Sequence, residues 1–148
     1  MTGSFDDMEI QIVTTNESET ETSGEALGRT LTGGEIIALY GGLGAGKTAF
    51  VRGLARGMGI SDRVTSPTFA IVNEYGENKR LCHFDMYRLR GPEELYEIGW
   101  YDYLASGAVC AVEWSENAGE AIPKGALTVN IENGADENQR VITISQRI

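Results

Sequence analysis

The sequence predicts a single α/β domain with a mixed central sheet, flanking helices and a C-terminal β-hairpin. Short apolar runs of strand length alternate with stretches of helical spacing, and two alternating strands close the chain. The length of 148 residues is about that of one domain. Hydrophobic residues make up 41% of the chain and charged residues 23%, as in ordinary globular domains, which argues against wholesale disorder.

The N-terminal part is expected to contain one strand and one acidic helix. We expect residues 1–8 to be a disordered leader and residues 9–148 to form the single domain. Apolar and polar residues alternate over 9–14, which predicts a strand. The threonine and asparagine at 15–16 can cap a helix over 17–30, whose first turns carry glutamates where the helix dipole favours acids.

The middle of the chain predicts a buried strand, an amphipathic helix and two further strands. Residues 35–40 form a short apolar run, as in a strand that is buried on both faces. Over 46–58 the apolar residues lie on one stripe at helical spacing, and glycines end this helix. The two strands are expected at 68–75 and 80–86, joined by a polar turn that contains glycine.

The C-terminal part predicts one short helix and three strands. A proline at the first position favours a helix over 92–99. Residues 108–112 are a second continuous apolar run, which is typical of a central strand. Alternating residues at 127–131 and 142–144 predict the hairpin, with Asn133-Gly134 between its strands.

The charge of the chain argues against direct binding of nucleic acid. The formal net charge is −10, and residues 1–35 hold eight acidic residues against one basic residue. Such a chain repels polyanions, so we expect no autonomous RNA or DNA binding. The acidic stretch 17–35 can serve as a docking surface, although most charge runs of this kind are simply solvated faces.

We expect neither a secretory signal peptide nor a zinc site in this sequence. Its acidic N-terminus lacks the basic and apolar regions of a secretory signal, and no apolar run approaches the ~20 residues that span a membrane. We therefore expect a cytoplasmic protein without a membrane partner. Cys82 and Cys110 have no CxxC partner and are expected to be buried thiols. With His83 as the only histidine, the spacing predicts no zinc site.

A glycine-rich motif lies between the predicted strand 35–40 and helix 46–58. Residues 41–48 read GGLGAGKT, which satisfies the complete GxxxxGK[ST] pattern in the strand–turn–helix context that it requires. Its backbone N–H groups can surround phosphate oxygens, Lys47 can reach the β- and γ-phosphates, and Thr48 can place its hydroxyl on Mg²⁺. The domain is therefore predicted to be P-loop NTPase-like. Its candidate nucleotide-binding residues are Gly42, Leu43, Gly44, Ala45, Gly46, Lys47, Thr48 and Ala49.

Two carboxylates are candidates for the metal side of this site. Glu113 ends the apolar run 108–112, and Asp85 ends the apolar residues 81–84. Because the carboxyl ends of strands in such sheets face the phosphate crevice, both side chains can point at a nucleotide. The alternative for each is a solvated acid at a strand end.

A hydroxyl-rich segment and a tryptophan complete the candidate site. Residues 65–68 read TSPT, and these three hydroxyls can contact the γ-phosphate or the attacking water, as in a nucleotide-sensing switch loop. An ordinary turn is the alternative. Trp114 follows the candidate acid directly and either packs on the nucleotide or belongs to the core. His83 can join a polar cluster with Asp85 and Tyr87, but we favour a satisfied, non-catalytic histidine.

The candidate residues divide into three roles. The segment and the tryptophan add three residues to the nucleotide-binding set, namely Thr65, Ser66 and Trp114. The candidate metal ligands are Thr48 and Glu113. The candidate catalytic residues are Lys47, Asp85, Glu113 and Thr68.

Several segments together resemble one family. The chain carries, in this order, GGLGAGKT at 41–48, SPTF at 66–69, HFDMYRL at 83–89, PEEL at 92–95 and VEW at 112–114. In these segments the chain resembles the bacterial TsaE (YjeE) family of ATPases that serve tRNA threonylcarbamoyladenosine formation. The resemblance covers roughly residues 10–145, and SPTF and HFDxYR are more specific to that family than the phosphate-binding motif is.

The resemblance implies a compact P-loop domain that binds ATP and Mg²⁺ and hydrolyses ATP slowly when alone. It also implies that the domain docks on TsaD in the TsaB–TsaD assembly, which transfers a threonylcarbamoyl group to N6 of adenosine 37 in tRNAs reading ANN codons. Contact with tRNA is then only indirect. By matching position, the resemblance assigns phosphate and metal binding to Lys47 and Thr48, the metal-side carboxylate to Glu113, a functionally needed acid to Asp85, the switch to residues 65–68, and a place near the nucleotide to Trp114.

One position departs from the family pattern. The family usually has aspartate where this chain has Gly42. That position is a wildcard of the motif, so phosphate binding is expected to survive the change.

Two other function classes compete with the tRNA-modification ATPase. A small-molecule P-loop kinase usually carries an arginine-rich lid and an acceptor pocket, and the chain has no obvious insertion for either. A non-enzymatic switch would bind ATP only to gate docking. The chain shows no Asn/Thr-Lys-x-Asp guanine-reading motif, which favours ATP over GTP in every case.

Overall fold

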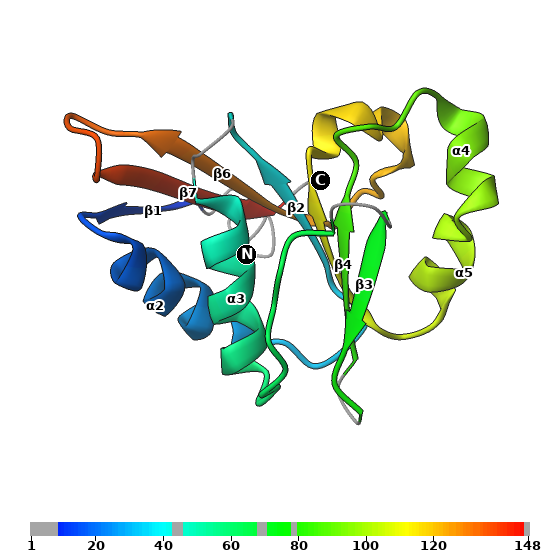
Figure 1. The fold of residues 1–148 in the computed structure, drawn as a ribbon, viewed down its shortest axis with the longest axis horizontal. Coiled ribbons are helices and arrows are strands. Elements are labelled where there is room, and N and C mark those ends of the chain that lie inside the picture. Colours follow the sequence, from blue (N-terminus) through cyan, green and yellow to red (C-terminus); the bar gives the residue numbers. More distant parts are fainter. Residues whose placement is uncertain (1–8, 43–45, 68–70, 78–79, 147–148) are drawn as a thin grey trace, which may run out of the picture.

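A computed structural model describes residues 9–42, 46–67, 71–77 and 80–146. The expected leader, 1–8, lies outside these residues. Seven strands form one sheet in the order β1-β7-β6-β2-β5-β4-β3 (Figure 1). The strands are β1 Glu9–Thr14, β2 Ile36–Tyr40, β3 Val72–Tyr75, β4 Leu81–Asp85, β5 Val109–Glu113, β6 Leu127–Asn133 and β7 Arg140–Gln146. The helices are α2 Glu17–Gly28, α3 Lys47–Gly57, α4 Pro92–Glu97 and α5 Trp100–Ala105, with short 3₁₀ turns at Ser115–Asn117 and Gly119–Ala121.

The sheet is mixed, as the sequence predicts. Its centre is parallel, because β2 pairs with both β5 and β6, and β5 pairs with β4. The outer pairs β1–β7, β6–β7 and β3–β4 are antiparallel. The carboxyl ends of β2, β4 and β5 therefore meet at one edge of the sheet, where Asp85 lies opposite Glu113 in register.

Helices cover both faces of the sheet. In Figure 1, α2 and α3 lie together on one side of the sheet, and α4 and α5 lie on the other. The first core packs Phe50, Val51 and Leu54 of α3 against the central strands. The second core packs Trp100 of α5 and Leu95 of α4 on the opposite side of the same strands. Successive side chains of each central strand thus point into two separate cores, as expected for strands that are buried on both faces.

Helices α2 and α3 make direct main-chain contact. A Cβ atom added at Gly53 would lie 1.8 Å from the carbonyl oxygen of Glu21, and one added at Gly24 would lie 2.1 Å from that of Phe50. A Cβ atom added at Gly28 would lie 2.3 Å from the carbonyl oxygen of Leu54, and one added at Gly57 would lie 2.2 Å from that of Glu25. Only glycine permits such an approach, so these four residues, Gly24, Gly28, Gly53 and Gly57, set the spacing of the two helices. We call them the glycine interface.

Ion pairs flank the glycine interface. Arg52 pairs with Glu17 at 3.1 Å and with Glu21 at 2.9 Å. Arg56 pairs with Glu21 at 3.2 Å and with Glu25 at 3.3 Å. Three of the four glutamates of α2, Glu17, Glu21 and Glu25, are therefore paired with arginines of α3. Whether residues 17–35 serve as a docking surface stays a prediction.

Most element boundaries lie within two residues of the sequence prediction, and three differences are larger. The helix expected over 92–99 ends at Glu97. Gly99, with φ of 78°, then caps the start of α5, a helix that the sequence did not predict. The strand expected over 68–75 begins at Val72 among the described residues. The hairpin loop is longer than expected: Gly134 N–H donates to the carbonyl of Gln139, and Asp136 accepts from the amides of residues 138 and 139.

Two other expectations can be compared with the described residues. Cys82 and Cys110 are buried free cysteines, as predicted. In the part of the chain that the structure describes, no helix is long and apolar enough to cross a bilayer.

Candidate active site

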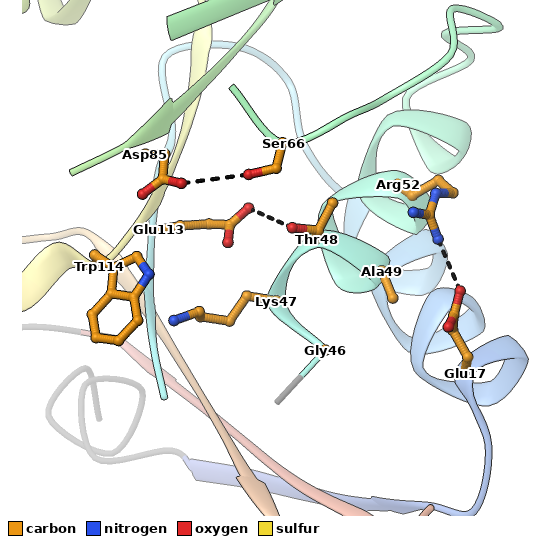
Figure 2. A pocket seen from close by; sticks show the side chains of 10 residues that line it. All are labelled: Glu17, Gly46, Lys47, Thr48, Ala49, Arg52, Ser66, Asp85, Glu113 and Trp114. Atoms are coloured by element: carbon orange, nitrogen blue, oxygen red, sulfur yellow. Dashed lines mark hydrogen bonds and ion pairs between the residues drawn. The ribbon is translucent and has the colours of Figure 1, made fainter. Parts of the chain in front are cut away.

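A cavity of about 380 Å³ lies at the carboxyl edge of the parallel strands. Figure 2 shows the side chains around it, which come from the start of α2, the first turns of α3, the segment before β3 and the ends of β4 and β5. The lining residues are Glu17, Gly46, Lys47, Thr48, Ala49, Arg52, Ser66, Asp85, Glu113 and Trp114.

The cavity opens on the N-terminus of α3. Gly46 precedes this helix in a left-handed conformation with φ of 98°, and no side chain caps the first turn. The first amides of a helix have no partner within the helix, and the helix dipole makes this end positive. The motif therefore presents backbone donors and positive potential to the cavity, which suits a phosphate group.

Lys47 is held inside the site by two contacts. Its ammonium donates a 2.6 Å hydrogen bond to the carbonyl of Gly41 and lies 3.8 Å from the centre of the Trp114 ring. Burial lowers the pKa of this ammonium, against the opposing charges of Glu113, Glu116 and Asp85. The cation is thus fixed next to the start of α3, where an anion would meet it.

The two candidate carboxylates lie side by side and carry hydroxyl partners. Thr48 Oγ1 donates to Glu113 Oε2 at 3.0 Å, which links the start of α3 to the end of β5. Ser66 Oγ donates to Asp85 Oδ2 at 3.4 Å, and the amide of Tyr87 donates to Asp85 Oδ1 at 2.9 Å. The site therefore gathers two carboxylates and two hydroxyls at the mouth of the phosphate-binding motif.

This set of oxygen atoms fits Mg²⁺. A hydroxyl and one or two carboxylates, completed by water and phosphate oxygens, are the usual surroundings of protein-bound Mg²⁺. In the described part of the chain, no group of three or more His, Cys, Asp and Glu side chains could hold a metal by itself. A cation here would accordingly depend on Thr48, Glu113 and the ligand's own oxygens.

The backbone after β5 turns sharply to bring Trp114 to the cavity. Trp114 has φ of 56° and is the one non-glycine residue with positive φ among the described residues. A non-glycine residue in this conformation costs energy and persists where the surroundings enforce it. Here the ring contacts both the Lys47 ammonium and the Tyr87 ring, whose centre is 4.9 Å away.

The structure gathers most of the candidate residues but not all of them. Gly46, Lys47, Thr48, Ala49, Ser66, Asp85, Glu113 and Trp114 line the cavity. Thr65 does not: its amide and carbonyl bond the Tyr75 hydroxyl instead, which directs the segment toward β3. Gly42 is not among the lining residues either, and a Cβ added there would meet no atom within 4 Å. Leu43, Gly44, Ala45 and Thr68 lie outside the described residues.

Three residues near the site were not predicted to act there. Arg52 lines the cavity one turn after Thr48, so helical spacing could have identified it. Glu17 reaches the cavity only because α2 packs on α3, which no local pattern reveals. His83 is buried against Glu113, with Nε2 2.6 Å from Oε2. The polar cluster of His83 with Tyr87 does not form, because Tyr87 packs on Trp114.

Comparisons with known proteins agree on one family. Residues 14–142 match the family model described as "Threonylcarbamoyl adenosine biosynthesis protein TsaE". The chain is 36% identical over 132 residues to the tRNA threonylcarbamoyladenosine biosynthesis protein TsaE of Treponema pallidum, covering 89% of this chain and 98% of that protein. It is 35% identical over 129 residues to the protein of the same name from Bacillus subtilis, covering 86% and 80%.

A solved structure shares the fold. The crystal structure of Bacillus subtilis YdiB superposes with a TM-score of 0.79 at 32% sequence identity, covering 95% of this chain and 87% of that one. The match confirms the predicted P-loop NTPase-like architecture with its mixed sheet and C-terminal hairpin.

Proposed function

Since this chain belongs to the TsaE family, we propose that it is an ATP-binding and ATP-hydrolysing subunit required for N6-threonylcarbamoyladenosine formation at position 37 of tRNA. In this proposal it couples a Mg²⁺-dependent ATPase cycle to turnover of the TsaB–TsaD transferase complex in the cytoplasm. It docks on TsaD and meets tRNA only through that complex.

One observation carries the nucleotide-binding part of the proposal. The Thr48 hydroxyl and the Glu113 carboxylate are hydrogen-bonded at the start of α3, beside the buried Lys47 ammonium. These are a metal-side hydroxyl, a metal-side acid and a phosphate-side cation on one rigid framework. Phosphoryl transfer needs mainly this kind of positioning and charge neutralisation.

Each site residue then has a proposed role. Lys47 neutralises the β- and γ-phosphates, while the amides of residues 42–49 surround them. Thr48 and Glu113 hold the Mg²⁺. Asp85, which already accepts from Ser66, orients the attacking water or its proton. Residues 65–68 act as the segment that senses the γ-phosphate.

The room beside the cavity supports a ligand larger than phosphate. A second cavity of about 160 Å³ shares Glu17, Gly46 and Ala49 with the first. It continues toward Asn16 at the start of α2 and Asn138 in the β6–β7 loop. We propose that the nucleoside lies in this direction, because the amide side chains there can bond a base or a ribose.

The proposed stimulation by partners follows from the cationic groups at the site. Arg52 is the arginine that lines the cavity, and Glu17 and Glu21 already bind it. Arg88 and Arg90 do not line the cavity. In this proposal an additional positive group comes from another chain, and groups of this kind raise phosphoryl-transfer rates by ~10³–10⁵ in GTPases.

The test is phosphate release from ATP with and without TsaB–TsaD, together with multiple-turnover tRNA modification. We expect slow hydrolysis by the chain alone, faster hydrolysis with the partners, and modification over many turnovers only when the chain is present. The Thr68→Ala variant is expected to lose the stimulation. Unchanged hydrolysis and undiminished modification without the chain would overturn the proposal.

The same measurements separate the competing functions. A nucleotide switch without hydrolysis would support modification while releasing no phosphate. A small-molecule kinase would transfer phosphate to an added acceptor and be indifferent to TsaB–TsaD. The family membership favours the tRNA-modification subunit over both.

A further inference from the structure

The only histidine of the chain lies at the metal side of the candidate site. His83 is fully buried in β4, and its Nε2 atom lies 2.6 Å from Glu113 Oε2. The Thr48 hydroxyl donates to the same carboxylate oxygen at 3.0 Å. One oxygen of Glu113 is therefore held from two sides, by a residue of β4 and by a residue of α3.

The proposed metal-side role of Glu113 requires an ionised carboxylate. Such an oxygen only accepts hydrogen bonds, so in this role the 2.6 Å contact needs a proton on Nε2 of His83. The other ring nitrogen, Nδ1, is buried and has no hydrogen-bond partner among the described residues. Among the residues that the structure describes, the bond to Glu113 is thus the one polar contact that orients this imidazole.

A merely structural histidine is a poor explanation for this arrangement. A buried polar atom without a partner is costly, and an apolar side chain at this position would avoid the unpaired Nδ1. The neighbouring strand residues Cys82 and Phe84 lie in the second core, on one face of the sheet. The side chain of His83 lies on the other face, together with Glu113, and its bond to Glu113 is the interaction that explains a histidine at this position.

We propose that His83 is a positioning residue that holds Glu113 Oε2 toward Thr48 and thereby sets the affinity of the site for the divalent cation that accompanies the nucleotide. The proposal rests on the proposed function. A glutamate side chain has several rotatable bonds, and fixing them when a cation binds costs conformational entropy. Two fixed donors order the carboxylate beforehand, so this cost is no longer part of cation binding. Partners that orient metal ligands in this way typically contribute 10–100-fold to metal affinity.

Lys47 is a positive group that could attract the Glu113 carboxylate. Lys47 and Glu113 line the same cavity (Figure 2), and the negative charge of Glu113 acts to raise the pKa of the Lys47 ammonium. Without the bond to His83, the Glu113 carboxylate would be able to turn toward the Lys47 ammonium. Glu113 would then no longer be available to the Mg²⁺, and Lys47 would no longer be available to the phosphates. By holding the carboxylate on Thr48, His83 keeps the acid for the cation and leaves Lys47 for the phosphates.

The experiment uses the full chain, purified without a histidine tag. Binding of the non-hydrolysable ATP analogue AMP-PNP is measured by calorimetry over a Mg²⁺ series and in EDTA. We compare wild type with His83→Leu, with His83→Gln, whose amide N–H can still donate to Glu113, and with Phe84→Leu. The last variant removes core packing from the same strand on the face away from Glu113.

We expect His83→Leu to need 10–100-fold more Mg²⁺ for half-maximal tightening of AMP-PNP binding, with binding in EDTA unchanged. His83→Gln should recover most of the loss. Phe84→Leu should lower the unfolding temperature without moving the Mg²⁺ requirement. An unchanged Mg²⁺ requirement in His83→Leu, or an equal shift in Phe84→Leu, would overturn the inference while leaving the proposed function intact. Absence of AMP-PNP binding by the wild type would overturn both.

A second measurement needs no variant. Because the chain has one histidine, its imidazole gives a single set of ¹⁵N resonances in long-range ¹H–¹⁵N correlation spectra. A proton on Nε2 is expected. A neutral ring protonated on Nδ1 alone could not donate to Glu113 and would exclude the proposed role, even if the leucine variant fails to fold.

Discussion

The ammonium of Lys47 lies 3.8 Å from the centre of the Trp114 ring. The two residues come from different elements, the start of α3 and the turn after β5, and the left-handed backbone of Trp114 brings the ring to the cation. A charge over the face of an indole is attracted by the electrons of the ring, and any displacement of that charge changes the surroundings of the fluorophore.

Tryptophan emission should therefore report nucleotide binding. Phosphate oxygens that draw Lys47 away from the ring will change the emission of Trp114 on addition of ADP or ATP. Trp100 is fully buried in the second core and should be silent. We expect Trp100→Phe to keep the nucleotide-dependent change and Trp114→Phe to lose it. The reverse pattern would place the ligand away from Trp114.

Replacing Lys47 with alanine should abolish ATP hydrolysis and weaken nucleotide binding. A charge-assisted hydrogen bond contributes about 1.5–3 kcal/mol, so roughly a ten- to hundredfold loss of affinity is expected by calorimetry. Thr48→Ala is the companion variant, because it should reduce binding in Mg²⁺ more than binding in EDTA. Normal hydrolysis by Lys47→Ala would refute the assignment of the phosphate site.

Glu113→Gln should leave ATP bound but slow its cleavage. The amide keeps the shape of the carboxylate and removes its charge from the metal side, where Thr48 and His83 now contact it. The measurement is single-turnover ATP cleavage, with Asp85→Asn in parallel. If Asp85→Asn blocks cleavage and Glu113→Gln has no effect, the roles of the two acids are exchanged.

Gly53→Ala should destabilise the fold although alanine favours helices. The new methyl group would lie 1.8 Å from the Glu21 carbonyl, and overpacking of this kind typically costs about 1–3 kcal/mol. The gain in helix propensity, about 1 kcal/mol, offsets only part of this loss. For a chain of this size the midpoint should fall by about 2–4 °C per kcal/mol of net loss.

The matched control is Gly42→Ala. A Cβ at Gly42 meets no atom within 4 Å, and its backbone is not in the left-handed region. Thermal unfolding should show almost no change for this variant. Equal midpoints for Gly53→Ala and wild type would mean that the two helices can separate freely, contrary to the close approach described here.

Local patterns were sufficient to predict the sheet and the family. The apolar runs, the GGLGAGKT motif and the alternating C-terminal strands predicted the mixed α/β fold, and the resemblance to TsaE is confirmed by the family match. The junction of α4 and α5 was missed because Pro92 and the residues after it continue a helical pattern through Gly99. Only the left-handed backbone of Gly99 divides the two helices.

The site was predictable where one strand or one motif supplies the residue, and not where packing supplies it. Lys47, Thr48, Asp85 and Glu113 follow from strand ends and the motif, and they do line one cavity. Glu17 enters through helix packing, and the contact of His83 with Glu113 depends on the register of β4 and β5. The roles of all these residues remain predictions.

The glycine interface has a mechanical consequence. Side chains between packed helices can change rotamer and absorb a small displacement, but at Gly24 and Gly53 the two backbones touch without such a layer. We therefore expect helices α2 and α3 to move together rather than to slide past each other. Because α2 follows β1, an edge strand of the sheet, a displacement at the start of α3 is expected to reach that edge.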